Sequence, residues 1–214
     1  MKRMAHASKK VVPLKKTGKE TIKSFRSRQG VSGKLLEQLH EKGRKYGLES
    51  VIAFDTDEIV LANWVCLKCR YGCSQYNSNW SCPPATPTIA EVRELLKEYA
   101  TALLLVGSQT CNEFYRDTNR KRTDQVRYWK GTVSLERQLF LEGYDKAFGL
   151  VSGACSLCRE CAYPEKCRFP MEKRPTVESL SIDLIGTLKN IGIGTPIAMD
   201  LHETFKYYSI ILLD

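Results

Sequence analysis

Eight of the nine cysteines in this chain fall into two closely spaced runs. The first run consists of Cys66, Cys69, Cys73 and Cys82, and the second consists of Cys155, Cys158, Cys161 and Cys167. A spacing of two residues lets neighbouring thiolates converge on one metal centre, while the backbone N–H groups between them can point at the sulfurs. Clustered cysteines in a reducing compartment indicate metal binding or redox chemistry, so these eight residues are the candidate metal ligands.

The second run is close to the ligand pattern of bacterial ferredoxins, in which three cysteines at two-residue gaps precede a fourth cysteine and a proline. Here the last gap is five residues and Pro170 comes later. A [4Fe–4S] cluster suits such a crowded triplet, because each corner of the cube accepts one thiolate. We therefore expect two [4Fe–4S] clusters, one for each run of four cysteines.

Structural zinc held by four thiolates is the alternative that the spacing leaves open. A zinc ribbon uses two C-x2-C pairs about 15–20 residues apart, or a mixture of Cys and His. The three histidines, His6, His40 and His202, lie outside both runs. Disulfides are not expected in the cytosol. A radical-SAM motif, C-x3-C-x2-C, would require a cysteine where Tyr76 stands, so this class is excluded.

The segments around the cysteines alternate between predicted helix and predicted strand. Apolar residues at helical spacing predict helices at 35–46, 88–99, 135–144 and 177–191. Apolar runs predict strands at 51–54, 59–62, 102–106, 147–151 and 207–213. Thr88 and Glu91 form a capping box, and the run 102–106 is typical of a strand covered on both faces. We expect an α/β fold, a layered sheet with helices, with both Cys-rich loops leaving strand ends.

The net charge of +9 is concentrated at the N-terminus. Residues 1–34 contain 11 Lys and Arg but one acid, Glu20, whereas the rest of the chain is almost neutral. We expect a basic, disordered arm over residues 1–33 and one Cys-rich metal-binding domain over residues 34–214. Nucleic acid is therefore not the expected partner of the folded body. No apolar run approaches the ~18 residues that cross a bilayer, so we expect a cytoplasmic protein without membrane contact.

Several residues outside the two runs are weaker candidates. A second basic stretch is expected to be a solvated face, or else a docking patch for an acidic redox carrier; its residues are Arg116, Arg120, Lys121, Arg122, Arg127 and Lys130. Tyr115, Tyr128 and Trp129 are interleaved with it, which makes single-stranded nucleic acid a weaker alternative. Asp183 is expected to be a solvent-facing helix acid, and Cys111 a buried free thiol.

The cysteine motifs resemble those of a known family. The segments that carry the resemblance are Lys68 to Cys73, Trp80 to Pro87, Leu135-Glu136, Gly143 to Ala147, Cys155 to Cys161, Lys166 to Pro170, Arg174-Pro175 and Tyr207-Tyr208. They are similar to the predicted metal-binding proteins of domain-of-unknown-function family 2284, which is common in anaerobic bacteria and archaea. The resemblance covers roughly residues 35–214 and implies metal binding. It also implies that Cys66 is a less regular member than Cys69, Cys73 and Cys82, which would leave the first cluster with an open corner.

These observations together predict an iron–sulfur protein that acts in electron transfer or in the reductive activation of a partner. The expected partner is a redox protein, namely a ferredoxin, a flavodoxin or a component of a reductase. The alternative is a zinc-stabilised binding or adaptor module without redox activity. A third possibility is an enzyme that uses an open-corner cluster as a Lewis acid.

Overall fold

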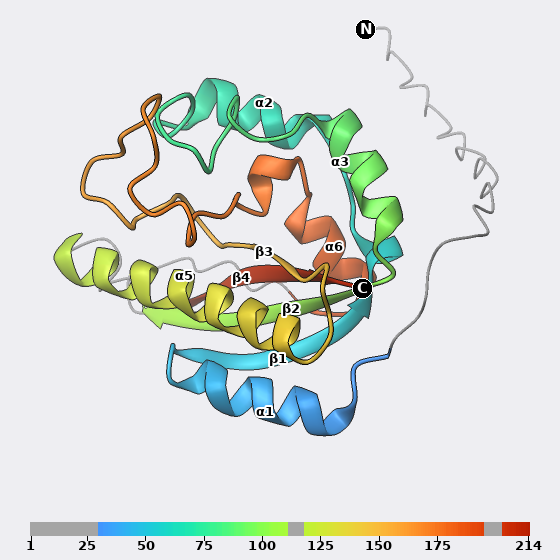
Figure 1. Ribbon diagram of the computed structural model, residues 1–214. Coiled ribbons are helices and arrows are strands. Elements are labelled where there is room, and N and C mark those ends of the chain that lie inside the picture. The colour runs from blue at the N-terminus through green and yellow to red at the C-terminus, as the bar shows by residue number, and fades with distance from the viewer. Residues whose placement is uncertain (1–29, 111–117, 195–202) are drawn as a thin grey trace, which may run out of the picture.

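Four antiparallel strands form a sheet in the order β1-β2-β4-β3 (Figure 1). Their bounds are β1 Leu48–Asp55, β2 Thr101–Thr110, β3 Phe148–Leu150 and β4 Thr204–Leu213. The computed structural model describes residues 30–110, 118–194 and 203–214. Most of the predicted arm, together with Cys111 and His202, lies outside the described residues. The α/β fold class predicted from the sequence is confirmed.

The central strands β2 and β4 are buried on both faces. Leu103 and Leu105 of β2 belong to the core on one face of the sheet. Ala102, Leu104 and Val106 belong to the core on the opposite face. This alternation follows from the two-residue period of a strand. It explains why the segment 102–106 is apolar without interruption, and it confirms the prediction that both faces of this strand are covered.

Helices cover each face of the sheet. Helix α1 (Gly33–Arg44) and helix α5 (Thr118–Leu141) pack on one face, where Leu39 and Leu135 are fully buried. Helix α3 (Ile89–Leu95) and helix α6 (Leu184–Asn190) pack on the other. Helix α2 (Asn63–Gly72) lies on that same side and farther from the sheet than α6 (Figure 1). None of the helices in the described part of the chain has the length and apolarity to cross a membrane.

The segment 59–62 is not the strand that its apolar residues predict. After β1 the chain makes the 3-10 turn η1 (Thr56–Glu58) and then forms one isolated bridge, between Leu61 and Ile182. The Asp183 N–H donates to the Val60 carbonyl at 2.7 Å, and Ala62 N–H donates to Ser181 O at 2.9 Å. These apolar residues therefore attach the start of α2 to the segment before α6 instead of extending the sheet.

Two helix predictions also change. The described part of the second basic stretch and most of the predicted helix at 135–144 form one continuous helix, α5, which ends at Leu141. The predicted helix at 177–191 is divided into the 3-10 turn η3 (Glu178–Leu180) and α6, because Ser181 adopts a left-handed conformation with φ 60°. Asp183 then begins α6 as its N-cap and accepts a hydrogen bond from Gly186 N–H at 2.9 Å.

Candidate metal centre

The first cysteine run begins in a helix and ends in a loop. Cys66 and Cys69 lie within α2, Cys73 follows its last residue, and Cys82 comes after an irregular segment. The sequence predicted that both cysteine runs lie in loops that leave strand ends. Six of the eight cysteines do lie in loops, whereas Cys66 and Cys69 lie in helix α2. Cys66 and Cys69 are three positions apart in the helix, so both thiols are on neighbouring positions of the same helical face.

The loop from Cys73 to Cys82 is fixed by hydrogen bonds. Asn77 adopts a left-handed φ of 55°, and its N–H donates to Pro83 O at 2.8 Å. The Asn79 side-chain oxygen accepts from Ser81 N–H at 2.9 Å. Thr176 N–H donates to Ser81 O at 3.2 Å, which attaches this loop to the segment after the second cysteine run. The loop is therefore ordered by its own polar groups, and Cys82 is buried at its end.

The second cysteine run lies in the long connection between β3 and η3. Cys155 packs against a small core that contains Trp129 and Leu157. The Phe169 N–H donates to the Cys167 sulfur at 3.4 Å. Such N–H to sulfur contacts are common around thiolate-bound metal centres, where they stabilise negative charge on the ligand.

Aromatic residues join the loops of the two runs. Trp80 and Tyr163 meet edge to face, with their ring centroids 5.0 Å apart. The Trp80 indole N–H donates to Glu165 O at 2.8 Å, and the Tyr163 hydroxyl bonds the Asn77 side-chain oxygen at 3.1 Å. About 85 residues separate these partners in the sequence, so the fold brings the two cysteine runs together in a way that their spacing could not predict.

Burial and neighbouring thiols raise the pKa of the central cysteines. Burial raises the pKa of Cys82 to about 11, a hydrogen bond from Asn79 lowers it, and the charges of Cys73, Cys69 and Cys155 raise it further. Burial is also the main cause of the raised pKa of Cys69. The charge effect of Cys155 on Cys82 agrees with the contacts that join the two loops. A bound metal cation would remove the cost of placing several thiolates together.

Cys155 shows the same balance of effects. Burial raises its pKa most, and hydrogen bonds from the Leu157 backbone N–H and the Ser81 side chain oppose the effect of burial. Cys161 and Cys158 raise the pKa further. The Ser81 hydroxyl is buried and has no hydrogen-bond partner of normal geometry in the described part of the chain, so its effect on Cys155 is one of proximity.

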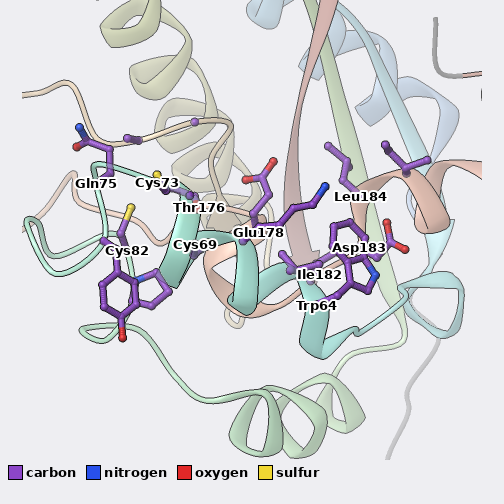
Figure 2. Close-up of a pocket in the computed structure, with 18 residues that line it drawn as sticks. Trp64, Cys69, Cys73, Gln75, Cys82, Thr176, Glu178, Ile182, Asp183 and Leu184 are labelled. Carbon is purple, nitrogen blue, oxygen red and sulfur yellow. The ribbon is translucent and has the colours of Figure 1, made fainter. Parts of the chain in front are cut away.

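Three thiols of each run face a hollow. Cys69, Cys73 and Cys82 line a hollow of about 560 Å³. Figure 2 shows Cys73 and Cys82 at one end of this hollow and Trp64 and Asp183 at the other. The thiols of the second run line a neighbouring hollow of about 710 Å³, and these are Cys155, Cys158 and Cys161. Cys66 and Cys167 line neither hollow.

The donor set consists of thiols, which iron–sulfur groups and zinc both accept as ligands. Each hollow is far larger than the ~30 Å³ that one water molecule occupies in the liquid, so each has room for a group of several atoms. Within the described residues, no three or more His, Cys, Asp or Glu side chains converge closely enough to hold one metal ion.

Glu178 is a residue of the first hollow that sequence analysis did not identify. Its carboxyl group lies between the thiol end and the Trp64 end of the hollow (Figure 2). Burial raises the pKa of Glu178, and only its own backbone N–H opposes this effect. The available signal was an acid beside Val177 within an apolar stripe. Asp183 also lines the hollow, so the prediction of a solvent-facing acid is replaced by a helix cap at the wall of the site.

The basic stretch in α5 has a structural role. Arg122 donates to Leu157 O at 3.1 Å, which supports the second cysteine loop, and Arg127 pairs with Asp124 at 3.0 Å. Tyr128 and Trp129 are buried, so neither offers a stacking surface to nucleic acid. Arg116 and Tyr115 lie outside the described residues, and the side chains of Arg120 and Lys121 are not described either. Arg122 and Arg127 therefore contribute to the fold, whereas Lys130 is exposed, and a docking role for this stretch stays a prediction.

Comparison with known proteins agrees with this arrangement. A family model described as "Predicted metal-binding protein (DUF2284)" matches residues 52–213, which include all eight clustered cysteines. The match leaves out the basic arm and α1. Comparisons with curated proteins and with solved structures give no match. Because the family model covers most of the chain, this protein belongs to the predicted metal-binding protein family DUF2284.

Proposed function

We propose that this protein carries two [4Fe–4S] clusters, one at each cysteine run, and that it transfers electrons or reductively activates a partner protein. One observation carries the proposal. Two groups of cysteines, separated by more than 70 residues of sequence, line two adjacent hollows with three thiols each. Electron carriers with two clusters place their clusters close together, and the charge interaction between Cys82 and Cys155 supports such proximity here.

The residues around the thiols are suited to this role. Bound clusters supply one-electron chemistry at a potential set by hydrogen bonds to sulfur, burial and net charge. This chain provides N–H and hydroxyl donors from Phe169, Ser81 and Asn79. The Trp80–Tyr163 contact shields the junction of the two loops. These groups would hold the ligands in place and adjust the charge on their sulfurs.

Zinc remains the competing metal. Zinc takes four thiolates at about 2.3 Å in a tetrahedron, which places the sulfurs within roughly 4 Å of one another. The size of the hollows favours a larger inorganic group, and the crowded C-x2-C-x2-C spacing favours a cube with one thiolate per corner. A zinc protein would be a binding or adaptor module.

The first hollow also favours a second function, which is catalysis at the first cluster. Cys66 does not line this hollow, whereas the Glu178 carboxyl group does. If three thiolates hold the first cluster, the fourth corner would face a cavity with an acidic side chain. Cys66→Ala separates the two cases, since unchanged iron content places Cys66 outside the ligand set.

Paired cysteine substitutions test the proposal. We expect Cys69→Ser/Cys73→Ser and Cys158→Ser/Cys161→Ser each to remove about half of the iron and of the absorbance near ~400 nm. Cys111→Ser is the matched control, because Cys111 belongs to neither run, and its iron content should equal that of the wild type. Loss of all iron from either pair, or of none, would contradict two independent clusters.

A further inference from the structure

The outer face of α2 exposes three large apolar side chains. Trp64, Leu67 and Tyr71 are 44, 58 and 78% exposed, far more than the buried Val65 of the same helix. Residues spaced by three and seven positions lie on one side of a helix, so these three side chains form a continuous stripe. We call Trp64, Leu67 and Tyr71 the α2 stripe. An apolar face of this kind, on a short helix, marks a site of interaction.

The α2 stripe lies directly over the first cysteine group. Cys66 and Cys69 are on the opposite side of the same helix, and Trp64 also lines the hollow that contains Cys69. A helix with its side chains is about 10–12 Å across. A molecule that rests on the stripe is therefore within about one helix diameter of the thiols. Helix α2 lies at the edge of the molecule, away from the sheet and from α5 (Figure 1).

The charged side chains of α2 and its flanking loops have one sign, and the acids nearest to them, Glu178 and Asp183, line the hollow on the inner side of the helix. Residues 59–90 contain only two charged side chains, Lys68 and Arg70, and both are positive. Neither forms an ion pair with any residue that the structure describes. The Lys68 ammonium is 4.8 Å from the centre of the Trp64 ring, and a hydrogen bond with Tyr76 raises the pKa of Arg70. The stripe is thus an apolar patch bordered by two cations.

We propose that the α2 stripe, with Lys68 and Arg70, is the docking surface for an acidic electron-carrier protein of the ferredoxin or flavodoxin kind. This inference rests on the proposed redox function and names the partner of the first cluster. Electron-transfer complexes are small and short-lived, which fits a patch of three apolar residues. Complementary charge raises the encounter rate and orients the partner.

The charge and size of the surface favour this occupant over two others. The chain's own residues 1–34 contain 11 Lys and Arg against one acid, so they are repelled by Lys68 and Arg70. An anionic membrane would attract the two cations, but three apolar side chains on a ten-residue helix provide only marginal anchoring. A negatively charged protein surface satisfies both the cations and the apolar stripe.

Anaerobic stopped-flow reduction of the full-length, iron-loaded protein tests the inference. The electron donor is purified reduced flavodoxin, and dithionite is the small-molecule comparison. We expect Leu67→Glu/Lys68→Glu to slow reduction by flavodoxin at least about tenfold, and higher salt to slow the wild type. The absorbance near ~400 nm should be unchanged, which shows that the cluster is intact, and reduction by dithionite, a small anion, should slow much less than reduction by flavodoxin. Leu141→Glu, at a position 84% exposed on the other side of the sheet, is the matched control and should behave as wild type.

Each alternative outcome has a distinct meaning. Equal flavodoxin rates in Leu67→Glu/Lys68→Glu and Leu141→Glu would overturn the docking surface and leave the redox function standing. If dithionite does not reduce the wild type, the redox function itself fails. If the stripe variant instead loses binding to vesicles of phosphatidylserine, with flavodoxin rates unaffected, the surface contacts membranes and the inference is wrong. Lys68→Arg keeps the charge and should retain the wild-type rate.

Discussion

The ion pair between Glu136 and Arg174 gives the sharpest stability prediction. Arg174 Nε and Nη2 donate to the two Glu136 oxygens at 2.7 and 2.5 Å, and both side chains are nearly buried, at 12 and 11% exposure. The same carboxylate accepts from Gly149 N–H of β3 at 2.8 Å. Arg174 Nη1 also bonds the carbonyls of Met171 and Lys173. The Glu136 carboxylate of α5 thus binds both β3, through Gly149, and the segment that follows the second cysteine run, through Arg174.

Arg174→Met should lower the free energy of unfolding by about 3–5 kcal/mol, because it leaves the Glu136 carboxylate buried and unpaired. Small domains are stable by only about 5–15 kcal/mol, so the effect would be a large part of the total. Metal binding would complicate the transition, so the measurement is urea unfolding of metal-free, reduced protein followed by circular dichroism.

A surface ion pair in the same chain provides the comparison. Lys97 pairs with Glu94 at 2.6 Å, but both side chains are more exposed, at 39 and 69%. Lys97→Met should therefore cost at most about 1 kcal/mol. Glu136→Gln added to Arg174→Met should recover part of the loss, because the amide removes the buried charge and still accepts from Gly149. The reasoning is refuted if Arg174→Met costs no more than Lys97→Met.

Three further predictions concern packing, reactivity and capping. A Cβ at Gly107 would come within 2.0 Å of the Tyr207 ring. Gly107→Ala should therefore lower the urea midpoint by the equivalent of about 1–3 kcal/mol. Gly33→Ala is the control, because a Cβ there meets nothing within 4 Å, and it should leave the midpoint unchanged. The pKa of Cys82 is about 11 instead of 9.0, so in metal-free protein at pH 8 its alkylation by iodoacetamide, followed by mass spectrometry, should be about a hundredfold slower than that of an unperturbed thiol. Raising the pH through 11 should abolish this difference. Asp183→Ala removes the cap of α6 and should cost about 0.5–2 kcal/mol in the same unfolding assay, and Asp183→Ser should cost less.

The pH dependence of folding in the metal-free protein follows from the same thiol. The folded state binds the Cys82 proton more tightly than the unfolded state, because its pKa rises from 9.0 to about 11. Its contribution to stability is therefore complete below pH 9 and is lost as the pH rises through 11. We expect the urea midpoint of metal-free protein to fall over this interval, and Cys82→Ala to reduce the slope of the fall.

Local patterns in the sequence predicted much of the fold. The continuous apolar run at 102–106 predicted a doubly covered strand, and Thr88 with Glu91 predicted the capping box that begins α3. Both signals depend on residues a few positions apart. The segment 59–62 was misassigned because apolar residues that attach a helix to a distant segment have the same pattern as those of a short strand.

The arrangement of the candidate site depended on contacts distant in sequence. The spacing of the cysteines identified two ligand groups but not their adjacency, which comes from the packing of Trp80 on Tyr163. The ion pair between Glu136 and Arg174 could not be predicted for the same reason. Both residues fall within the segments that resemble the family, but nothing in their spacing indicates that they are in contact. Glu178 was overlooked because a single acid in an apolar stripe has no motif of its own.

Metal analysis of anaerobically purified protein tests the central claim most directly. The two-cluster account predicts a brown protein with about eight iron and eight acid-labile sulfide per chain, and less than stoichiometric zinc. The count should fall to about half in either paired cysteine variant. A colourless protein that contains one or two zinc per chain, with no iron or sulfide, would contradict the account.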